Sequence, residues 1–512
     1  MSMTSFSFFI LVSVLVILYY ILPGRCQLYL LLLSSLVFCL SAGGIRMVLF
    51  LGFSIITTWA GALGLEKAQS EKKKKTILFS VLIANLAILF MMKYLNFFVY
   101  TGRAIGNIFG IDISWSEFSM IAPLGLSFYT LQVIGYLLDV WRGSCKPQKN
   151  LIKYAVFAGF FPQLVQGPIN RYPEMEKTLY SIKKFEYEKV TFGAQRMLWG
   201  LFKKLVIAER MAVIVNTVYG NYEAYQGGYI VLATVCFAFQ LYTDFSGAMD
   251  IALGVSEMLG IRMAENFDNP FFSASISEYW RRWHISLGNW MKDYVFYPVL
   301  KTNFLVTVGN KSKKKWGKKK GKKIPLYMGM LLLWFTVGFW HGGAWKYIIG
   351  SGLLHCTYII SGQMLEPLFK KMIEAFKVNT NCFSFRLFQS LRTFFLVCIG
   401  FVFFRAGSAL EAVDMLKKVF VCNFQIWRDG SLLKLGLDAQ DFSVGIISLM
   451  ILLLVSVLQQ KYHKEGKTVR GVLAEQNLIF RWMIYYGLIF AVLILGCYGF
   501  GYDASSFIYQ NF

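Results

Sequence analysis

The stretch KSKKKWGKKKGKKIPLYMGMLLLWFTVGFWHGG, residues 311–343, decides the class of fold. Its first thirteen residues contain nine lysines and no acid. The run that follows, from Ile324 to Trp340, holds no charged residue and approaches the roughly 20 apolar residues that a membrane-spanning helix needs. A basic segment beside an apolar run is typical of the cytoplasmic end of such a helix. Residues 311–343 therefore predict a helix that crosses a bilayer.

The rest of the chain carries the same signal. Of its 512 residues, 56% are hydrophobic and 16% are charged, whereas soluble domains carry about 25% charged residues. Lipid offers no hydrogen-bond partners to backbone groups, and the sequence lacks the alternating pattern of a β-barrel. The long apolar runs of this chain therefore predict helices. Clear spans are predicted near 6–22, 28–41, 47–65, 77–92, 227–254, 327–345, 346–362, 390–405, 441–459 and 480–499. Weaker or interrupted ones fall near 94–110, 119–140, 151–166 and 192–218. We therefore expect an all-α polytopic membrane protein with about ten to fourteen transmembrane or re-entrant helices.

The middle of the chain is its most interrupted part. Phe161-Pro162-Gln163 and Gln166-Gly167-Pro168 break one apolar segment, and Asp244 and Asp250 lie in or next to another. Irregular backbone survives at membrane depth only where protein or a wet cavity covers it. We expect one membrane domain over residues 1–512 with its functional core in the middle. Its predicted parts are N-terminal helices (1–118), a catalytic core with re-entrant segments (119–362) that includes a Lys-rich cytoplasmic loop (299–324), and C-terminal helices (363–512).

The excess of positive charge is concentrated in two runs. Lys and Arg number 52 and Asp and Glu 28, a net charge of +24, and Lys72–Lys75 form a second run besides Lys311–Lys323. In a soluble protein such runs would indicate nucleic-acid binding, but between apolar segments they indicate cytoplasmic loops, and we expect no nucleic-acid partner. Anionic membrane lipids, or an acidic donor carrier docking from the cytosol, are the further partners that this charge favours.

One of the four histidines lies deep in a predicted span. His341 is sixteen residues after Pro325, about 24 Å along the helix if neither Gly338 nor Gly342-Gly343 ends it early. An ionisable side chain at such depth indicates function, the alternative being a neutral imidazole hydrogen-bonded between helices. His355 lies in another apolar segment and fits packing and function equally well. His463 lies in a polar loop and is expected to be solvated.

The motifs of several other site classes are missing from the sequence. It has no G-x-S-x-G and no G-x-x-x-x-G-K-[ST], which argues against a serine hydrolase of the usual kind and an ATP-driven pump. Its nine cysteines form no C-x-x-C pair, and His341 and His355 lack the spacing of a helical zinc site, so no metal is expected. A neutral imidazole can still take the proton of a hydroxyl that attacks an activated acyl carbon.

The segment from Ser275 to Pro298 differs from the apolar spans. Ser275-Ile-Ser-Glu278 has the pattern of a helix capping box, and the residues after it mix Trp and Tyr with Arg and Lys. Such a composition predicts a helix at the membrane interface or lining a polar cavity. Because the Lys-rich segment follows, this helix is expected near the cytoplasmic face.

A series of short segments, in a fixed order, spans nearly the whole chain. They are Pro123-Leu-Gly-Leu-Ser-Phe-Tyr129, Tyr136 to Asp139, Phe161-Pro-Gln-Leu-Val-Gln-Gly-Pro168 with Arg171-Tyr172, Gln240-Leu-Tyr-Thr-Asp-Phe-Ser-Gly247 with Asp250, Tyr279-Trp-Arg-Arg-Trp-His-Ile-Ser-Leu287, Gly338-Phe-Trp-His-Gly342, Phe401-Val-Phe-Phe-Arg-Ala406 and Ser506-Phe-Ile-Tyr509. Together they resemble the membrane-bound O-acyltransferase superfamily, and within it the alginate O-acetyltransferase-like branch.

This resemblance implies a fold and a pair of site residues. It implies helices around a central tunnel, in which a donor from the cytosol meets an extracellular acceptor hydroxyl. The family's invariant His corresponds to His341, and a second His, in the W-R-R-W-H segment, corresponds to His284, which is expected to help shape the donor entrance. We predict His341 and His284 as the catalytic residues. Asp244 and Asp250 are expected to belong to the core architecture, and the donor thioester takes the place of a bound cofactor.

The expected function is acyl transfer at a bacterial plasma membrane by a multi-pass protein. An acyl group, expected to be acetyl, would pass from a cytosolic thioester, on coenzyme A or an acidic carrier protein, to hydroxyls of a cell-surface polysaccharide or to an extracytoplasmic acetyltransferase partner. D-alanyl transfer to teichoic acid is an alternative, although that family usually has Asp-Phe-Ala-Gly and Trp-Asn-Arg-Trp-His where this chain has Asp-Phe-Ser-Gly and Trp-Arg-Arg-Trp-His.

Two alternatives of other classes stay open at this point. A transporter or flippase would also use broken helices and intramembrane Asp and His, but transporters often show paired half-repeats, and neither W-R-R-W-H nor W-H-G has a second copy. In a non-catalytic scaffold, the histidines would only satisfy packing.

Overall fold

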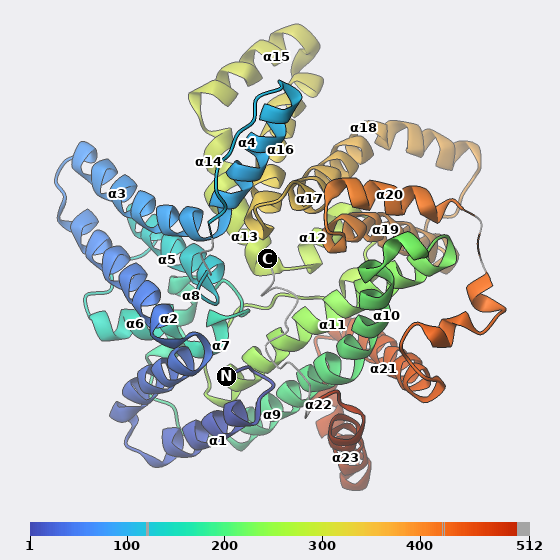
Figure 1. Cartoon of the computed structure of the whole chain (residues 1–512). Helices are drawn as coiled ribbons and strands as arrows, with labels where there is room; N and C mark the ends of the chain where they lie inside the picture. The colour runs from blue at the N-terminus through green and yellow to red at the C-terminus, as the bar shows by residue number, and fades with distance from the viewer. Residues whose placement is uncertain (119–121, 422, 424, 499–512) are drawn as a thin grey trace. The chain divides into compact units, whose positions relative to one another are not determined.

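The computed structural model describes residues 1–118, 122–421, 423 and 425–498, and within these ranges the regular elements are helices (Figure 1). In this part of the chain, eight helical stretches are long and apolar enough to cross a membrane: Gly24–Lys67, Glu71–Ile108, Gly228–Met258, Lys323–His341, Trp345–Ala375, Phe383–Arg405, Ala439–Lys464 and Leu478–Leu495. The prediction of an all-α polytopic membrane protein is confirmed. The segment Ser506–Tyr509 lies outside the described residues, as do the ends of the spans predicted at 119–140 and 480–499.

The chain folds into two compact units. Unit 1 consists of Met1–Glu209, Leu241–Ala264 and Val444–Phe512, and unit 2 consists of Arg210–Gln240 and Glu265–Ser443. One border falls inside the long helix α11 (Gly228–Met258), so that its first part belongs to unit 2 and its second part to unit 1. The division of one domain into 1–118, 119–362 and 363–512 stays a prediction.

Unit 1 is built on a long, bent second helix. Its helices are α1 (Phe6–Ile21), α2 (Gln27–Lys67), α3 (Glu71–Leu89), α4 (Leu95–Ile108), α5 (Leu126–Trp141), α6 (Leu151–Gly159), α7 (Phe161–Leu164), α8 (Tyr172–Leu179), α9 (Tyr187–Leu201), α22 (Val469–Ala474), α23 (Leu478–Leu495) and most of α21 (Ala439–Lys464). Gly44 adopts φ 65° and bends α2 between the two spans predicted at 28–41 and 47–65. The helix α2 packs against α1, α3, α5 and α6 (Figure 1). The segment with Pro162 is broken as expected, since extended backbone at Phe160 separates α6 from the four-residue α7.

Unit 2 carries the segments of His284, His341 and His355, the last two of which lie in candidate membrane spans. Its helices are α10 (Glu209–Gly220, apart from its first residue), α12 (Ile276–Arg282), α13 (Ile285–Met291), α14 (Tyr297–Leu300), α15 (Asn303–Gly321), α16 (Lys323–His341), α17 (Trp345–Tyr347), α18 (Leu354–Ala375), α19 (Phe383–Arg405) and α20 (Ala409–Val419). Four segments of the described chain are π-helical: Phe90–Tyr94 and Phe202–Ala208 in unit 1, and Lys292–Phe296 and Ile348–Leu353 in unit 2. Such segments are rare and are frequent at functional sites.

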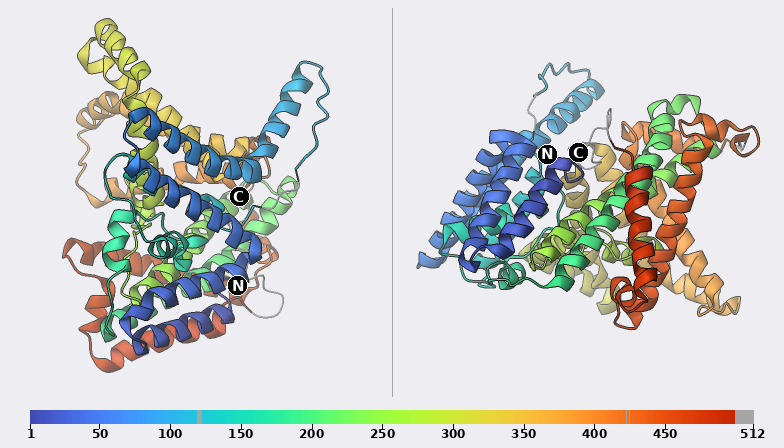
Figure 2. Two further views of the ribbon diagram at one scale, coloured as in Figure 1. Left: turned by 90° about the vertical axis from the view of Figure 1, so that its left-hand side faces the viewer. Right: turned by 90° about the horizontal axis from the view of Figure 1, so that it is seen from below.

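The Lys-rich segment 299–324, which we predicted as a loop, is mostly helical. The Thr302 side chain accepts the backbone N–H of Leu305 and so caps the start of α15. Lysine is a good helix former, and this local preference prevails where the chain meets water. The first part of α15 lies beside the beginning of α16, because a Cβ on Gly309 would lie 3.3 Å from the Pro325 ring (Figure 2).

Candidate functional site

His341 is the last residue of α16, and its side chain is buried. The helix runs without a break through Gly338, so the prediction that His341 lies far along a continuous span is confirmed. The imidazole is 4% exposed and contacts the ring of Phe404 in α19, with a distance of 5.6 Å between ring centroids. A helix end frees backbone groups from intrahelical bonding. The sequence therefore places an imidazole and a non-helical backbone together inside an apolar environment.

His284 lies at a break that the sequence did not reveal. We expected one helix from Ser275 onward, but α12 ends at Arg282 and α13 begins at Ile285. His284 between them has φ 48° and ψ 52°, a left-handed conformation that costs energy for a residue with a Cβ. The capping box is confirmed: the Ser275 hydroxyl accepts the Glu278 N–H, and the Glu278 carboxylate accepts the Ala274 N–H.

Asn266 holds the chain in this strained turn. Its side-chain oxygen accepts the Ser286 N–H at 2.9 Å, and its backbone oxygen accepts the Ile285 N–H at 3.1 Å. The same side-chain oxygen lies 3.4 Å from Nδ1 of His284. Because an amide oxygen only accepts, this contact favours a proton on Nδ1 and leaves Nε2 as the basic nitrogen.

Both histidines lie against the ring of Trp340. The ring centroid of Trp340 lies 5.9 Å from that of His284 and 5.2 Å from that of His341. Burial lowers the pKa of His284 well below its usual range, and the charge of the nearby His341 lowers it further. Burial therefore keeps the His284 imidazole neutral, with a lone pair on one ring nitrogen. The structure thus brings together both predicted site residues, which stand 57 positions apart (341 − 284).

Glycine contacts fix the end of α16 that carries His341. A Cβ on Gly338 would lie 2.7 Å from the Ile348 Cα and 2.7 Å from the Tyr347 oxygen, so the π-helical segment Ile348–Leu353 approaches the α16 backbone directly. A similar contact lies one turn earlier, where Gly352 faces the backbone oxygen of Trp334. Because close backbone packing leaves no room for a methyl group, these glycines set the position of His341.

The Gly338→Ala variant is expected to lower the free energy of unfolding by about 1–3 kcal/mol, because the added methyl group overpacks the α16 contact. Thermal unfolding of the detergent-solubilised protein measures this change. Gly362→Ala in α18 is the matched control, since nothing lies within 4 Å of its added Cβ and alanine favours a helix. Equal losses of stability in the two variants would contradict the close packing at Gly338.

His355 forms a second buried group with Trp280 and Trp334. Its ring is 2% exposed, and the centroid distances are 5.0 Å to Trp280 and 6.0 Å to Trp334. Among the residues that the structure describes, none forms a hydrogen bond with the buried His355 Nδ1 or Trp280 Nε1. Trp334 lies on the same face of α16 as His341 and two turns before it, about 10 Å nearer the Lys-rich end. The W-R-R-W-H segment therefore contacts α16 at two positions along its length. Trp280 contacts Trp334, and His284 contacts Trp340.

The predicted tunnel stays a prediction. Both imidazoles are buried, and a pocket of about 310 Å³ lies elsewhere in unit 2, lined by Tyr225, Tyr229 and Ser431 among others. Within residues 1–118, 122–421, 423 and 425–498, no three His, Cys, Asp or Glu side chains lie together as metal ligands would.

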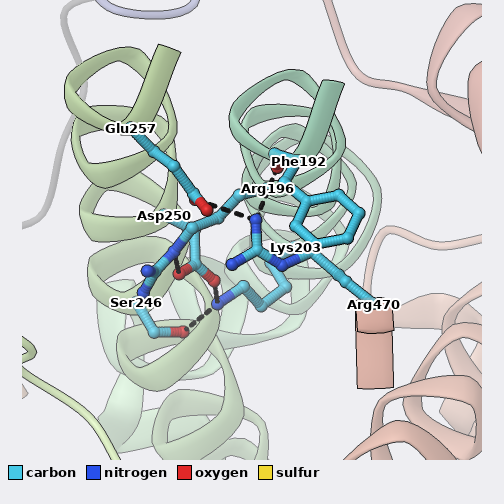
Figure 3. A network of polar contacts seen from close by, with 7 residues as sticks. All are labelled: Phe192, Arg196, Lys203, Ser246, Asp250, Glu257 and Arg470. Carbon is cyan, nitrogen blue, oxygen red and sulfur yellow. Dashed lines mark hydrogen bonds and ion pairs between the residues drawn. The ribbon is translucent and has the colours of Figure 1, made fainter. Parts of the chain in front are cut away.

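The aspartates of the D-F-S-G segment lie in unit 1 within a ladder of ion pairs. Asp250 accepts from Arg196 at 2.9 Å and from Lys203 at 2.6 Å, and Lys203 also donates to the Ser246 hydroxyl (Figure 3). The sequence alone did not identify Arg196 and Lys203 as partners of Asp250. The presence of charged residues inside the weakly apolar segment 192–218 could have indicated such ion pairs.

The ladder continues on both sides of Asp250. Lys204 pairs with Asp244 at 2.5 Å and with Glu209 at 2.9 Å. At the other end, Arg470 pairs with Glu257 at 2.8 Å and also donates to a backbone oxygen of α9 (Figure 3). Every acid of the D-F-S-G helix named here therefore has a basic partner.

Small residues let the two helices of this ladder touch. A Cβ on Gly200 of α9 would lie 2.6 Å from the Gly247 oxygen of α11, and one on Gly193 would lie 2.5 Å from the Gly254 oxygen. From Gly200 to Gly193 the contact moves seven residues back along α9, and from Gly247 to Gly254 it moves seven residues forward along α11. The two helices therefore run antiparallel. Paired charges along a tight helix contact support the prediction that Asp244 and Asp250 belong to the architecture.

Comparison with known proteins gives a consistent set of relatives. The model of the membrane-bound O-acyltransferase family matches residues 147–309. The chain is 30% identical over 458 residues to a protein of Pseudomonas syringae pv. tomato named probable alginate O-acetylase AlgI, covering 89% of this chain and 82% of that protein. It is 29% identical to the peptidoglycan O-acetyltransferase of Helicobacter pylori, over 76% of this chain and 72% of that one. It is 31% identical to the teichoic acid D-alanyltransferase of Bacillus subtilis, over 60% of this chain and 78% of that one.

Proposed function

Because this chain belongs to the membrane-bound O-acyltransferase family, we propose that it transfers an acetyl group from a cytosolic thioester to hydroxyls of a cell-surface polysaccharide, with His341 as the general base. The chain is an O-acyltransferase and a multi-pass membrane protein. The observation that carries the proposal is the pair of buried imidazoles that both contact Trp340.

Acyl transfer requires a base that removes the hydroxyl proton and a hydrogen-bond donor that stabilises the oxyanion of the intermediate. The imidazole of His341 takes the proton of the acceptor hydroxyl as its oxygen bonds to the thioester carbonyl carbon. The carbon–sulfur bond of the tetrahedral intermediate then breaks, and the imidazolium returns the proton to the departing thiolate. The indole N–H of Trp340, whose ring contacts both imidazoles, is the candidate donor to the intermediate's oxyanion. His284, held in one orientation by Asn266, shapes the donor side of this site.

The second buried group supports a thioester donor. The pantetheine arm that coenzyme A and carrier proteins share contains amides, each with one N–H and one C=O group. The indole N–H of Trp280 and Nδ1 of His355 are buried polar atoms that such amides would satisfy. They lie beside the part of α16 that precedes His341, towards the Lys-rich end where a cytosolic donor would enter.

Acetyl transfer is favoured over D-alanyl transfer by the extent of the similarity. The alginate O-acetylase relative aligns with 89% of this chain, and the D-alanyltransferase of Bacillus subtilis aligns with 60%. The acceptor lies outside the cytoplasm in this proposal, because the named relatives act on alginate, peptidoglycan or teichoic acid. An extracytoplasmic partner protein would complete the modification of the glycan.

The purified protein in liposomes is expected to consume acetyl-coenzyme A when alginate or peptidoglycan oligosaccharides are supplied, and the measurement is release of the free thiol together with mass spectrometry of the glycan. Parallel samples receive D-alanyl carrier protein with teichoic acid. If the protein consumes only the D-alanyl thioester, its function is D-alanyl transfer to teichoic acid and not acetyl transfer. A well-folded sample that consumes neither thioester would overturn the proposal.

A further inference from the structure

The helix α15 is a hairpin rather than a straight rod. Gly317 has φ 75° and ψ 164°, which breaks the helix after Trp316 and turns the chain back. The returning arm touches the first one, because a Cβ on Gly321 would lie 2.5 Å from the backbone N and Cα of Lys313. The returning arm then leads directly into the membrane-spanning helix α16, which begins at Lys323.

This hairpin concentrates positive charge. All nine lysines from Lys311 to Lys323 are exposed. The nearest acidic residues in the sequence are Asp293 before the hairpin and Glu366 after it. Because the two arms touch at the backbone, the hairpin gathers these positive charges on one short segment of chain. Anions from outside the chain would reduce the repulsion between them.

An aromatic side chain lies at the turn. Trp316 is 50% exposed, and the Lys315 ammonium lies 4.9 Å from the centre of its ring. Tryptophan is enriched at the level of lipid headgroups because its ring is apolar and its N–H is polar. The hairpin is also tied to the start of a span, since the six residues from Lys318 to Lys323 cover only about 9 Å of helix.

We propose that the hairpin of residues 303–321 binds anionic phospholipid headgroups of the cytoplasmic leaflet, with the lysines as the headgroup ligands and Trp316 inserted between them. Two observations favour a lipid surface over an acidic soluble protein: the exposed tryptophan at the turn and the short connection to α16. This inference goes beyond acyl transfer and does not depend on the identity of the donor.

Native mass spectrometry of the full chain, titrated with dioleoylphosphatidylglycerol or dioleoylphosphatidylcholine, tests the proposal. The wild type is expected to bind phosphatidylglycerol more tightly, and rising salt should weaken that binding. Replacing six hairpin lysines by Gln (K313Q, K314Q, K315Q, K318Q, K319Q and K320Q) should weaken it by at least about tenfold. The variant W316A should weaken the binding of both lipids.

A control at the other lysine run separates the hairpin from charge in general. Replacing Lys72, Lys73, Lys74 and Lys75 by Gln removes the other lysine run and should leave most phosphatidylglycerol binding in place. Equal binding by the wild type and the six-lysine variant would overturn the proposal. So would a six-lysine variant that loses binding of an acidic acyl carrier protein but retains phosphatidylglycerol, since the occupant would then be the carrier. Thermal unfolding confirms that each variant is folded, and an unfolded six-lysine variant is replaced by its two halves, one arm at a time.

Discussion

The His341→Ala variant is expected to lose acyl transfer, with the rate falling roughly 100- to 10,000-fold, the range that general-base catalysis contributes. The imidazole lies at the end of α16 beside Trp340 and Phe404, and it is the ionisable group that the proposed proton transfer requires. Initial rates of thioester consumption by purified wild type and variant measure the effect. The loss should appear in kcat, because the base acts in the chemical step.

Two controls separate this chemical role from a structural one. His341→Gln keeps most of the side-chain volume and should fold as the wild type does, yet it should be as inactive as the alanine variant. His463→Ala removes an exposed histidine from the end of α21 and should leave the rate unchanged. Full activity of a folded His341→Gln protein would remove His341 from the mechanism and leave packing between helices as its role.

The Asp250→Asn variant is expected to destabilise the protein by about 3–5 kcal/mol. Lys203, whose side chain is 4% exposed, and Arg196 would lose the carboxylate that neutralises them, and an uncompensated buried charge is costly. The measurement is the midpoint of thermal unfolding of the solubilised protein. An exposed pair supplies the control: Glu366→Gln, opposite Lys370 on α18, should leave the midpoint of thermal unfolding nearly unchanged, because water screens this pair.

The same variant tests whether Asp250 is architectural. An architectural residue lowers stability and yield, whereas the activity of the protein that remains folded should stay near that of the wild type. An Asp250→Asn protein as stable as the wild type but inactive would show that Asp250 acts in the reaction. That outcome would also contradict the interpretation of the ion-pair ladder as a structural element.

Much of the fold class followed from the sequence because it depends on interactions between near neighbours. An apolar run of about 20 residues forms a helix in the membrane because lipid offers its backbone groups no hydrogen-bond partners. This holds whichever segments pack against the helix. The cap of α12 at Ser275 followed in the same way, from the S-x-x-E spacing. The end of α16 did not, since the sequence predicted a span over 327–345 and the helix ends at His341. The resemblance of the motif segments also pointed to His284 and His341 as candidate site residues.

Other features depend on contacts between residues far apart in the chain, and only the tertiary structure decided them. The left-handed turn at His284 exists because Asn266, 18 positions earlier, holds it. The lysines at 203 and 204 became a charge ladder because the glycines of α9 and α11 let two helices touch. Hydropathy determined which segments enter the membrane. Hydrogen bonds, ion pairs and backbone contacts between distant segments determined which side chains meet. A pattern along the sequence does not give the distances between residues that are far apart in the chain.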